Sequence, residues 1–140
     1  MSAGTATLDS VQTALINAGV GQKTNSANDW MIFKGFLQDG DPVADRAICL
    51  YETPGTPPLE AWAIDYPGVQ VVVRGRADDY TAVRGKIQDV FTALHAREIN
   101  ISADFVYFYA RQSGPLSMGR DERRRPSLSW NFRTMRNRPA

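Results

Sequence analysis

The chain has 140 residues, of which 43% are hydrophobic and 22% charged, a composition typical of a single soluble globular domain spanning residues 1–140. It contains one cysteine and one histidine, which exclude an internal disulfide and a multi-histidine metal centre. No apolar run approaches the roughly 20 residues of a membrane helix, and the N-terminus lacks the pattern of a signal peptide. We therefore expect a soluble cytoplasmic product with no membrane partner.

The first half of the chain predicts a helix followed by a β-hairpin. Apolar residues recur at helical spacing over residues 8–18, and Gly19 follows as a stop signal. Residues 30–37 are rich in aromatic side chains and predict a strand. The Asp-Gly-Asp-Pro sequence at residues 39–42 predicts a hairpin bend, after which residues 46–52 form the return strand.

The middle of the chain predicts a loop, a strand and a second helix. Residues 53–67 contain four prolines, which favours a long loop without regular structure. Residues 69–74 are mostly valine and predict a strand. A helix over residues 80–94 has one apolar face, and Asp78 is expected to cap it while Asp79 lies near its positive end.

Two further strands are predicted from alternating apolar residues at 104–111 and 127–134. Residues 1–6 and 137–140 are expected to be flexible. The predicted order is α-β-β-β-α-β-β, with no internal repeat. We expect a single-domain α+β fold in which two helices flank a mixed, mostly antiparallel sheet.

The sequence offers no set of residues for catalysis. His95 ends the second predicted helix, where a cation interacts with the helix dipole, and Cys49 is expected to be a small buried hydrophobic residue. The segment Arg74-Gly75-Arg76 lacks the glycine spacing and the Lys-Ser/Thr of a phosphate-binding loop. We therefore expect a non-enzyme with no catalytic, cofactor-binding or metal-binding residues.

Charge is distributed unevenly along the chain. Residues 1–119 carry a net charge of −4, whereas residues 120–140 carry +5, and all the basic residues of the second segment are arginines. Arginine binds carboxylate and phosphate groups through its planar, bidentate guanidinium. Opposite charges on two parts of one subunit favour head-to-tail association of copies, in a ring or a stack.

The arginine-rich segment 119–126 lies between the last two predicted strands, where a loop is held out from a rigid scaffold. We expect reversal of its three consecutive arginines, 123–125, to Glu to leave the monomer folded and to block assembly. The candidate interface residues are Arg120, Asp121, Glu122, Arg123, Arg124, Arg125, Arg74 and Arg76.

Arginines near aromatic strands also suggest a small nucleic-acid-binding module, with Phe105, Tyr107 and Tyr109 as a stacking platform. The predicted element order differs from that of an RNA-recognition module, and the first 119 residues are net acidic. A place for these aromatic side chains in the core or in a subunit interface is therefore favoured.

Several short motifs, in this order and spacing, resemble the bacteriophage minor capsid and tail terminator proteins of long-tailed phages. The resemblance extends over residues 30 to 136 and is clearest from Tyr66 onward. The motifs are Pro67-Gly68 before a strand, Arg74-Gly75 at its end, Asp79-Tyr80 opening a helix, Ser117-Met118-Gly119-Arg120-Asp121-Glu122 between strands, and Asn131-Phe132.

The resemblance implies a structural virion protein without a cofactor. Such a protein forms a hexameric ring at the head-proximal end of the tail tube, ends tube polymerisation and provides the surface that joins the head connector. It implies as partners other copies of the chain, the tail tube protein and the head–tail connector or stopper protein, with DNA only passing through the lumen. A head-closure or adaptor protein of the same junction is the alternative. Residues 53–67 and 121–125 are expected to supply inter-subunit or inter-ring contacts.

Overall fold

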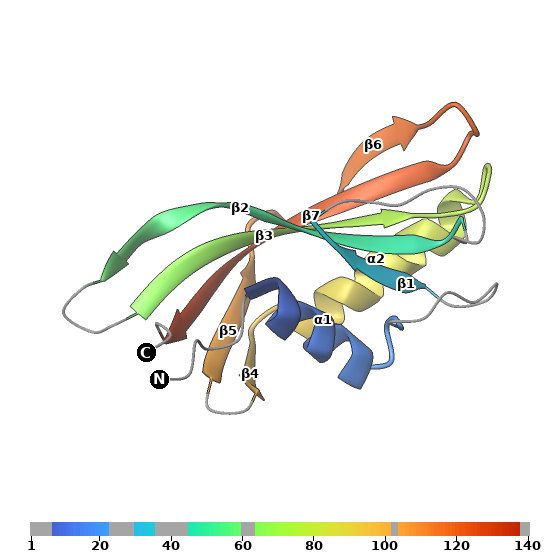
Figure 1. Ribbon diagram of the computed structural model, residues 1–140. Coiled ribbons are helices and arrows are strands. Elements are labelled where there is room, and N and C mark those ends of the chain that lie inside the picture. Colours follow the sequence, from blue (N-terminus) through green and yellow to red (C-terminus); the bar gives the residue numbers. More distant parts are fainter. Residues whose placement is uncertain (1–6, 23–29, 36–44, 60–63, 102–103, 138–140) are drawn as a thin grey trace.

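The structure, a computed structural model, describes residues 7–22, 30–35, 45–59, 64–101 and 104–137 (Figure 1). Two helices and a mixed, mostly antiparallel sheet form an α+β domain, which confirms the predicted fold class. Four strands follow the second helix where two were predicted. The elements are α1 (Thr7–Asn17), β1 (Met31–Lys34), β2 (Ala47–Leu59), β3 (Ile64–Arg74), α2 (Tyr80–Leu94), β4 (Arg97–Ile101), β5 (Asp104–Ala110), β6 (Leu116–Arg120) and β7 (Pro126–Asn137).

The sheet has the strand order β1-β2-β3-β7-β5-β4, and β6 pairs with β7 outside this path. The predicted hairpin between residues 30–37 and 46–52 is wrong, because β1 pairs with β2 in parallel, from Met31 opposite Ala47 to Lys34 opposite Leu50. A parallel pair needs a connection of about a dozen residues rather than a tight turn. The predicted bend at residues 39–42 lies outside the described residues.

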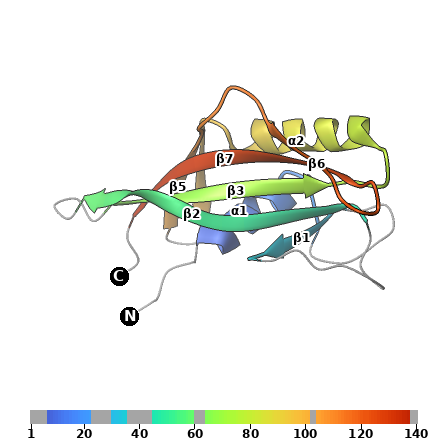
Figure 2. The same ribbon diagram turned by 90° about the horizontal axis from the view of Figure 1, so that it is seen from above.

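The predicted loop over residues 53–67 is also wrong, since β2 and β3 form a long antiparallel pair through most of this segment. Three of the four prolines lie in β2 beyond Leu50, where the described part of β1 no longer pairs with it and β2 is an edge strand. Pro67 lies in the central strand β3, at a shift in the pairing register. The pairing register shifts twice, once between Thr53 and Thr56 and once between Thr56 and Leu59. Figure 2 shows this strand pair extending from one end of the sheet.

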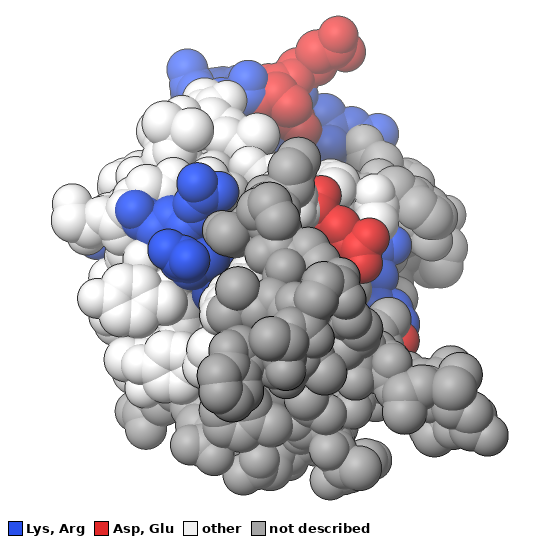
Figure 3. Space-filling model, turned by 90° about the vertical axis from the view of Figure 1, so that its left-hand side faces the viewer, with Lys and Arg blue, Asp and Glu red and all other residues white. Residues whose placement is uncertain are grey.

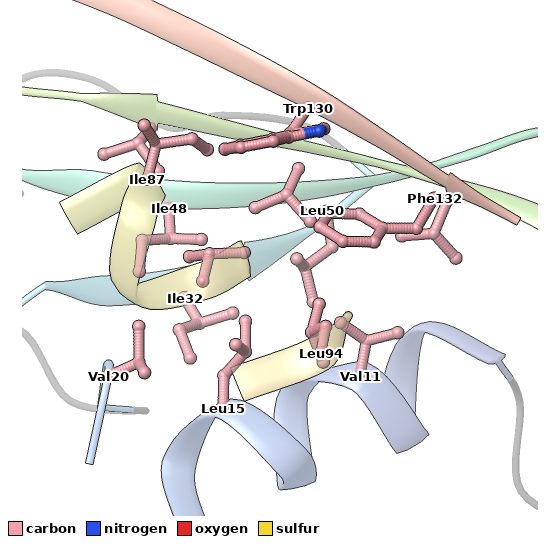
Figure 4. Packing of buried hydrophobic residues seen from close by; sticks show 14 of the residues in the cluster. Val11, Leu15, Val20, Ile32, Ile48, Leu50, Ile87, Leu94, Trp130 and Phe132 are labelled. Carbon is pink, nitrogen blue, oxygen red and sulfur yellow. The ribbon is translucent and has the colours of Figure 1, made fainter. Parts of the chain in front are cut away.

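The two helices lie on one face of the sheet (Figures 1 and 2), as the sequence predicted. The predicted apolar stripe of β7 points toward them, and its Trp130 ring stacks on Phe91 of α2 with the ring centroids 4.4 Å apart. Figure 4 shows the side chains of α1, α2 and the strands meeting between the layers. Burial of each large apolar side chain contributes about 1.5–3 kcal/mol. The largest fully buried residues are Trp130, Phe108, Phe132, Leu15, Ile48, Leu50, Ile87 and Leu94.

The end of α1 agrees with the predicted stop signal, whereas the residue that caps α2 differs from the predicted one. Gly19 has φ +74° and ends α1 as expected, with the amide of Val20 donating to the carbonyl of Leu15 at 2.9 Å. Asp79, and not Asp78, caps α2, because its carboxylate accepts the amide of Ala82 at 3.2 Å. Asp78 lies one residue before the cap, so its side chain is available for other contacts.

His95 is the C-cap of α2, as its position predicted. Its Nδ1 accepts the backbone amide of Ala110 at 3.1 Å. The ring also stacks on Phe91 at 4.6 Å. His95 therefore joins α2 to β5.

The two ends of the chain lie mostly outside the described residues. This applies to residues 1–6 and 138–140, which were predicted to be flexible. Asn137, which belongs to the same prediction, is the last residue of β7 and pairs with Ile64 of β3. The flexibility of residues 1–6 and 137–140 stays a prediction.

Candidate interaction surface

The arginine-rich segment forms a β-hairpin that leaves the main sheet (Figure 1). Its first part, predicted as loop, is the strand β6, and residues 121–125 connect it to β7. Asp121 organises this turn, since its Oδ1 accepts the backbone amides of Arg123 at 2.9 Å and Arg125 at 3.0 Å. An Asp side chain that bonds to its own turn in this way fixes the local backbone. The candidate residues are therefore presented in one geometry.

Arg125 is buried within the subunit, with 4% of its surface exposed. Its Nε donates to Oδ2 of Asp121 at 2.8 Å, and its Nη1 donates to Oδ1 of Asp45 at 3.2 Å. The neighbouring Arg74 is buried as well, and its Nε donates to the backbone carbonyl of Asp45 at 2.9 Å. Two of the candidate interface residues thus hold the hairpin base to the sheet. The expectation that the monomer stays folded when residues 123–125 are reversed to Glu stays a prediction, and the burial of Arg125 argues against it at that position.

Asp78 connects the hairpin to the start of α2. Its carboxylate pairs with Arg120 at 2.6 Å and with Arg124 at 2.7 Å, and its amide donates to the carbonyl of Arg124 at 2.8 Å. Asp78 has φ 59° and Arg124 has φ 62°, a region that non-glycine residues rarely occupy. Such backbone conformations persist only where the surroundings fix them, and they are concentrated at functional sites.

Hydrogen bonds and charge set the protonation of Asp121. Burial by itself raises the pKa of this carboxyl, but the hydrogen bonds from the backbone and side chain of Arg125, its positive charge and the amide of Arg123 together outweigh that effect. The pKa of Asp121 lies below its ordinary value of 3.8 as a result. The turn therefore keeps its charged form at neutral pH.

The remaining candidate residues lie at the same end of the molecule. An open hollow of about 480 Å³ is lined by Arg120, Asp121, Glu122, Arg123 and Arg125. Arg76 lies in the turn between β3 and α2, beside the amide of Gly75, which donates to Pro126 at the start of β7. The structure thus brings all the candidates to the hairpin and its base, where three acidic residues of the same chain, Asp45, Asp78 and Asp121, offset much of their charge.

Sequence reasoning missed the sheet face that points away from the helices. Leu116 lies opposite Ser129 and so points away from the core residues Leu128 and Trp130. Leu116 is 59% exposed and Met118 is 54% exposed. The alternation in β6 was overlooked because the strand is short and follows a Gly-Pro pair, a signal of a loop.

The same face carries two hollows, one at each end. One, of about 360 Å³, lies beside β6 and is lined by Tyr51, Gln70, Val72, Met118, Gly119, Arg120, Asp121 and Ser127. The other, of about 270 Å³, is lined by Tyr66, Tyr107, Tyr109, Arg133, Thr134 and Met135. Figure 3 shows that Lys and Arg side chains at this second end of the molecule are set among uncharged residues. Of the predicted stacking platform, Tyr107 and Tyr109 do share this face, whereas the side chain of Phe105 lies outside the described residues.

The described residues show no site for catalysis. They contain no group of three or more His, Cys, Asp and Glu residues that could hold a metal ion. Cys49 is fully buried, as predicted, and burial raises the pKa of its thiol, which disfavours a nucleophilic thiolate. In the same part of the chain, no helix is long and apolar enough to cross a membrane.

Comparison with known proteins identifies the family. The sequence model of a family described as bacteriophage tail terminator protein matches residues 14–137, which contain all the described strands, α2 and both hollows. No curated protein matches the chain significantly. The family match confirms the resemblance seen in the sequence. It also agrees with the ion pairs that fix the hairpin in one geometry, as suits a structural protein. The chain belongs to the bacteriophage tail terminator protein family and is a structural component of a phage tail.

Proposed function

We propose that six copies of this chain form a ring at the head-proximal end of the tail tube, where the ring ends tube polymerisation and provides the surface that joins the head. The partners are other copies of the chain, the tail tube protein and the head–tail connector or stopper protein, while DNA only passes through the lumen. The family match over residues 14–137 supports this assignment. The protein acts by binding and does not catalyse a reaction.

The observation that carries the proposal is the fixed geometry of the β6–β7 hairpin. A ring that ends a polymer must bind the tube on one face and must not accept another tube subunit on the opposite face. Rigid, projecting elements achieve this, because they bind without first being ordered. The ion pairs of Asp78 and Arg125 hold the hairpin in such a state.

Within the ring, the candidate residues divide into two groups. Six of them are exposed in the isolated subunit and are proposed to contact a neighbouring subunit or ring: Arg76, Arg120, Asp121, Glu122, Arg123 and Arg124. Arg74 and Arg125 are buried and are proposed to position that surface. The long β2–β3 pair, in which β2 lies at an edge of the sheet beyond Leu50, is the second proposed contact element.

The test is electron microscopy of particles made by a phage that lacks this gene product. We expect tail tubes of abnormal and variable length that are not attached to heads, restored to normal by expression of the chain. Tubes of normal length without heads would contradict termination and would instead identify a head-closure or adaptor protein.

The nucleic-acid alternative is tested by DNA binding at 50 and 200 mM salt, since affinity based on phosphate contacts falls steeply with salt. We expect no tight binding at either concentration. Three arginines of the hairpin already pair with acidic residues of the same chain. Tight binding that weakens strongly between the two concentrations would contradict this account.

A further inference from the structure

We propose that the contact between neighbouring copies is head-to-tail across the helix-free sheet face, with β6 of one copy seated in the tyrosine-lined hollow of the next. This inference rests on the proposed ring and names the surfaces that close it. The apolar ridge is Leu116 and Met118. The tyrosine hollow is Tyr66, Tyr107, Tyr109, Arg133, Thr134 and Met135.

The apolar ridge has the properties of one half of an interface. All five residues of β6 are exposed, and among the described strands β6 pairs only with β7. Leu116 lies opposite Ser129, and Met118 lines a hollow together with Val72 and Ser127, so both apolar side chains lie on the helix-free face. Two more exposed large hydrophobic residues are Tyr109, in the tyrosine hollow, and Tyr80, at the start of α2. Adjacent exposed apolar side chains on a fixed strand mark a contact site.

The tyrosine hollow has the properties of the other half. Tyr109 lies opposite Arg133, and Tyr107 lies opposite Met135, so these side chains converge on one side of the β5–β7 pair. Tyrosine, arginine and methionine are the residue types enriched in protein interfaces. The hollow has a volume of about 270 Å³ and is open to the surface, so that one or two side chains of a protein partner fit in it.

Charge complementarity favours a second copy as the occupant. Arg120, at the end of β6, and Arg124, in the turn, already pair with Asp78 of the same chain. Glu122 is exposed in the same turn, so its carboxylate is the group beside the apolar ridge that a basic residue of another copy would meet. Arg133 lines the tyrosine hollow and is exposed. One chain thus carries an apolar strand with an exposed carboxylate at its end and, at the other end of the sheet, a hollow with a basic residue. Figure 1 shows β6 rising from the sheet and β5 descending from it, so the two halves face different directions. The contact is therefore heterologous and generates a ring when the rotation closes.

The experiment uses two variants of the full chain, each with one half of the contact removed. The ridge variant is Leu116→Ser with Met118→Ser, and the hollow variant is Tyr109→Ser with Arg133→Glu. Arg133→Glu alone is a further hollow variant that keeps the contact between the rings of Tyr109 and His95, whose centroids are 4.7 Å apart. Native mass spectrometry measures their assembly in solution, and electron microscopy measures it on purified tail tubes.

We expect each variant to raise the concentration at which rings form by at least about tenfold, the effect of losing one interface anchor. An equimolar mixture of the ridge and hollow variants retains one intact pair of surfaces. That mixture should form 1:1 dimers that cannot grow. The matched control is Tyr80→Ser, because Tyr80 is 54% exposed, as is Met118, but lies at the start of α2. It should assemble like the wild type.

The outcomes separate this inference from the proposed ring. A wild-type chain that stays monomeric both in solution and on tail tubes overturns the ring itself. Wild-type rings together with normal rings of the ridge or hollow variants leave the ring intact and overturn the surfaces named here. A mixture of the two variants that remains monomeric, while the wild type forms rings, overturns their head-to-tail pairing.

Discussion

Arg123 and Arg125 differ in environment although they belong to one run of arginines. Arg125 is buried between Asp121 and Asp45, whereas Arg123 is exposed in the turn. Because both carboxylates are partly exposed, the loss of Arg125 is moderated by hydration of its partners. We expect Arg125→Ala to lower the free energy of unfolding by about 1–3 kcal/mol. Arg123→Ala, the matched control, should change it by less than about 0.5 kcal/mol.

Urea unfolding of the two variants measures this difference directly. The slope of the free energy with urea should be the same for both, so that the midpoints can be compared. Equal midpoints for Arg125→Ala and Arg123→Ala would contradict a structural role for Arg125.

Asp121 should make the stability of the hairpin end depend on pH. Its folded-state pKa is lowered, so the stabilisation is present above the unfolded-state pKa near 3.8 and is lost as the pH falls through the lower, folded-state value. We expect the difference in unfolding free energy between the wild type and Asp121→Ala to be constant from pH 5 to 7 and to shrink below about pH 4. Denaturant unfolding across this range measures it. A difference that grows as the pH falls would contradict a lowered pKa of Asp121 in the folded state.

At the scale of elements, close packing between β3 and α2 depends on Gly75. A Cβ at this position would collide with the side chain of Val83, which is fully buried in α2. We expect Gly75→Ala to cost about 1–3 kcal/mol of stability through overpacking. Gly85, within α2, has no neighbour near an added Cβ, so Gly85→Ala should stabilise the protein by about 0.5–1 kcal/mol. Thermal unfolding of both variants measures these changes in stability. Changes of the same sign in the two variants would contradict the prediction.

Asp78 should hold the turn of the β6–β7 hairpin against the start of α2, while Arg74 and Arg125 hold the base of the hairpin. Each exposed ion pair contributes less than about 1 kcal/mol, so Asp78→Asn should change global stability little. Loss of the two pairs should instead increase hydrogen exchange of the backbone amides over residues 116–125. Lys86→Gln, which removes an ion pair elsewhere on α2, is the control and should leave exchange in this segment unchanged. Unaltered exchange in Asp78→Asn would show that these ion pairs do not hold the hairpin.

The elements that could be predicted are those whose pattern reflects local burial. Helix α2 and strand β7 show clear periodicity because each buries one face in the core. The prolines of β2 concealed a strand because its outer part is an edge, a property of neighbours distant in sequence. The parallel pairing of β1 and β2 was hidden for the same reason, since the pattern of a strand does not specify the direction of its partner.

At the scale of the whole molecule, the position of the candidate site in the sequence could be predicted, but the ion pairs that hold its arginines could not. The arginine cluster at residues 119–126 is visible in the sequence, whereas Asp45 and Asp78, which bind it, are distant along the chain. The apolar ridge and the tyrosine hollow become one face only when β5, β6 and β7 are placed side by side. The net charges of the two segments therefore overstated the charge that the hairpin presents to a partner.

The central claim is that the protein stops growth of the tail tube, and addition of the purified chain to polymerising tail tube protein tests it most directly. Tube lengths are measured by electron microscopy over a series of chain concentrations, with gold-labelled chain to show its position. The account predicts shorter tubes as the concentration rises, with the label at one end of each tube. Tubes of unchanged length, or label spread along their sides, would contradict it.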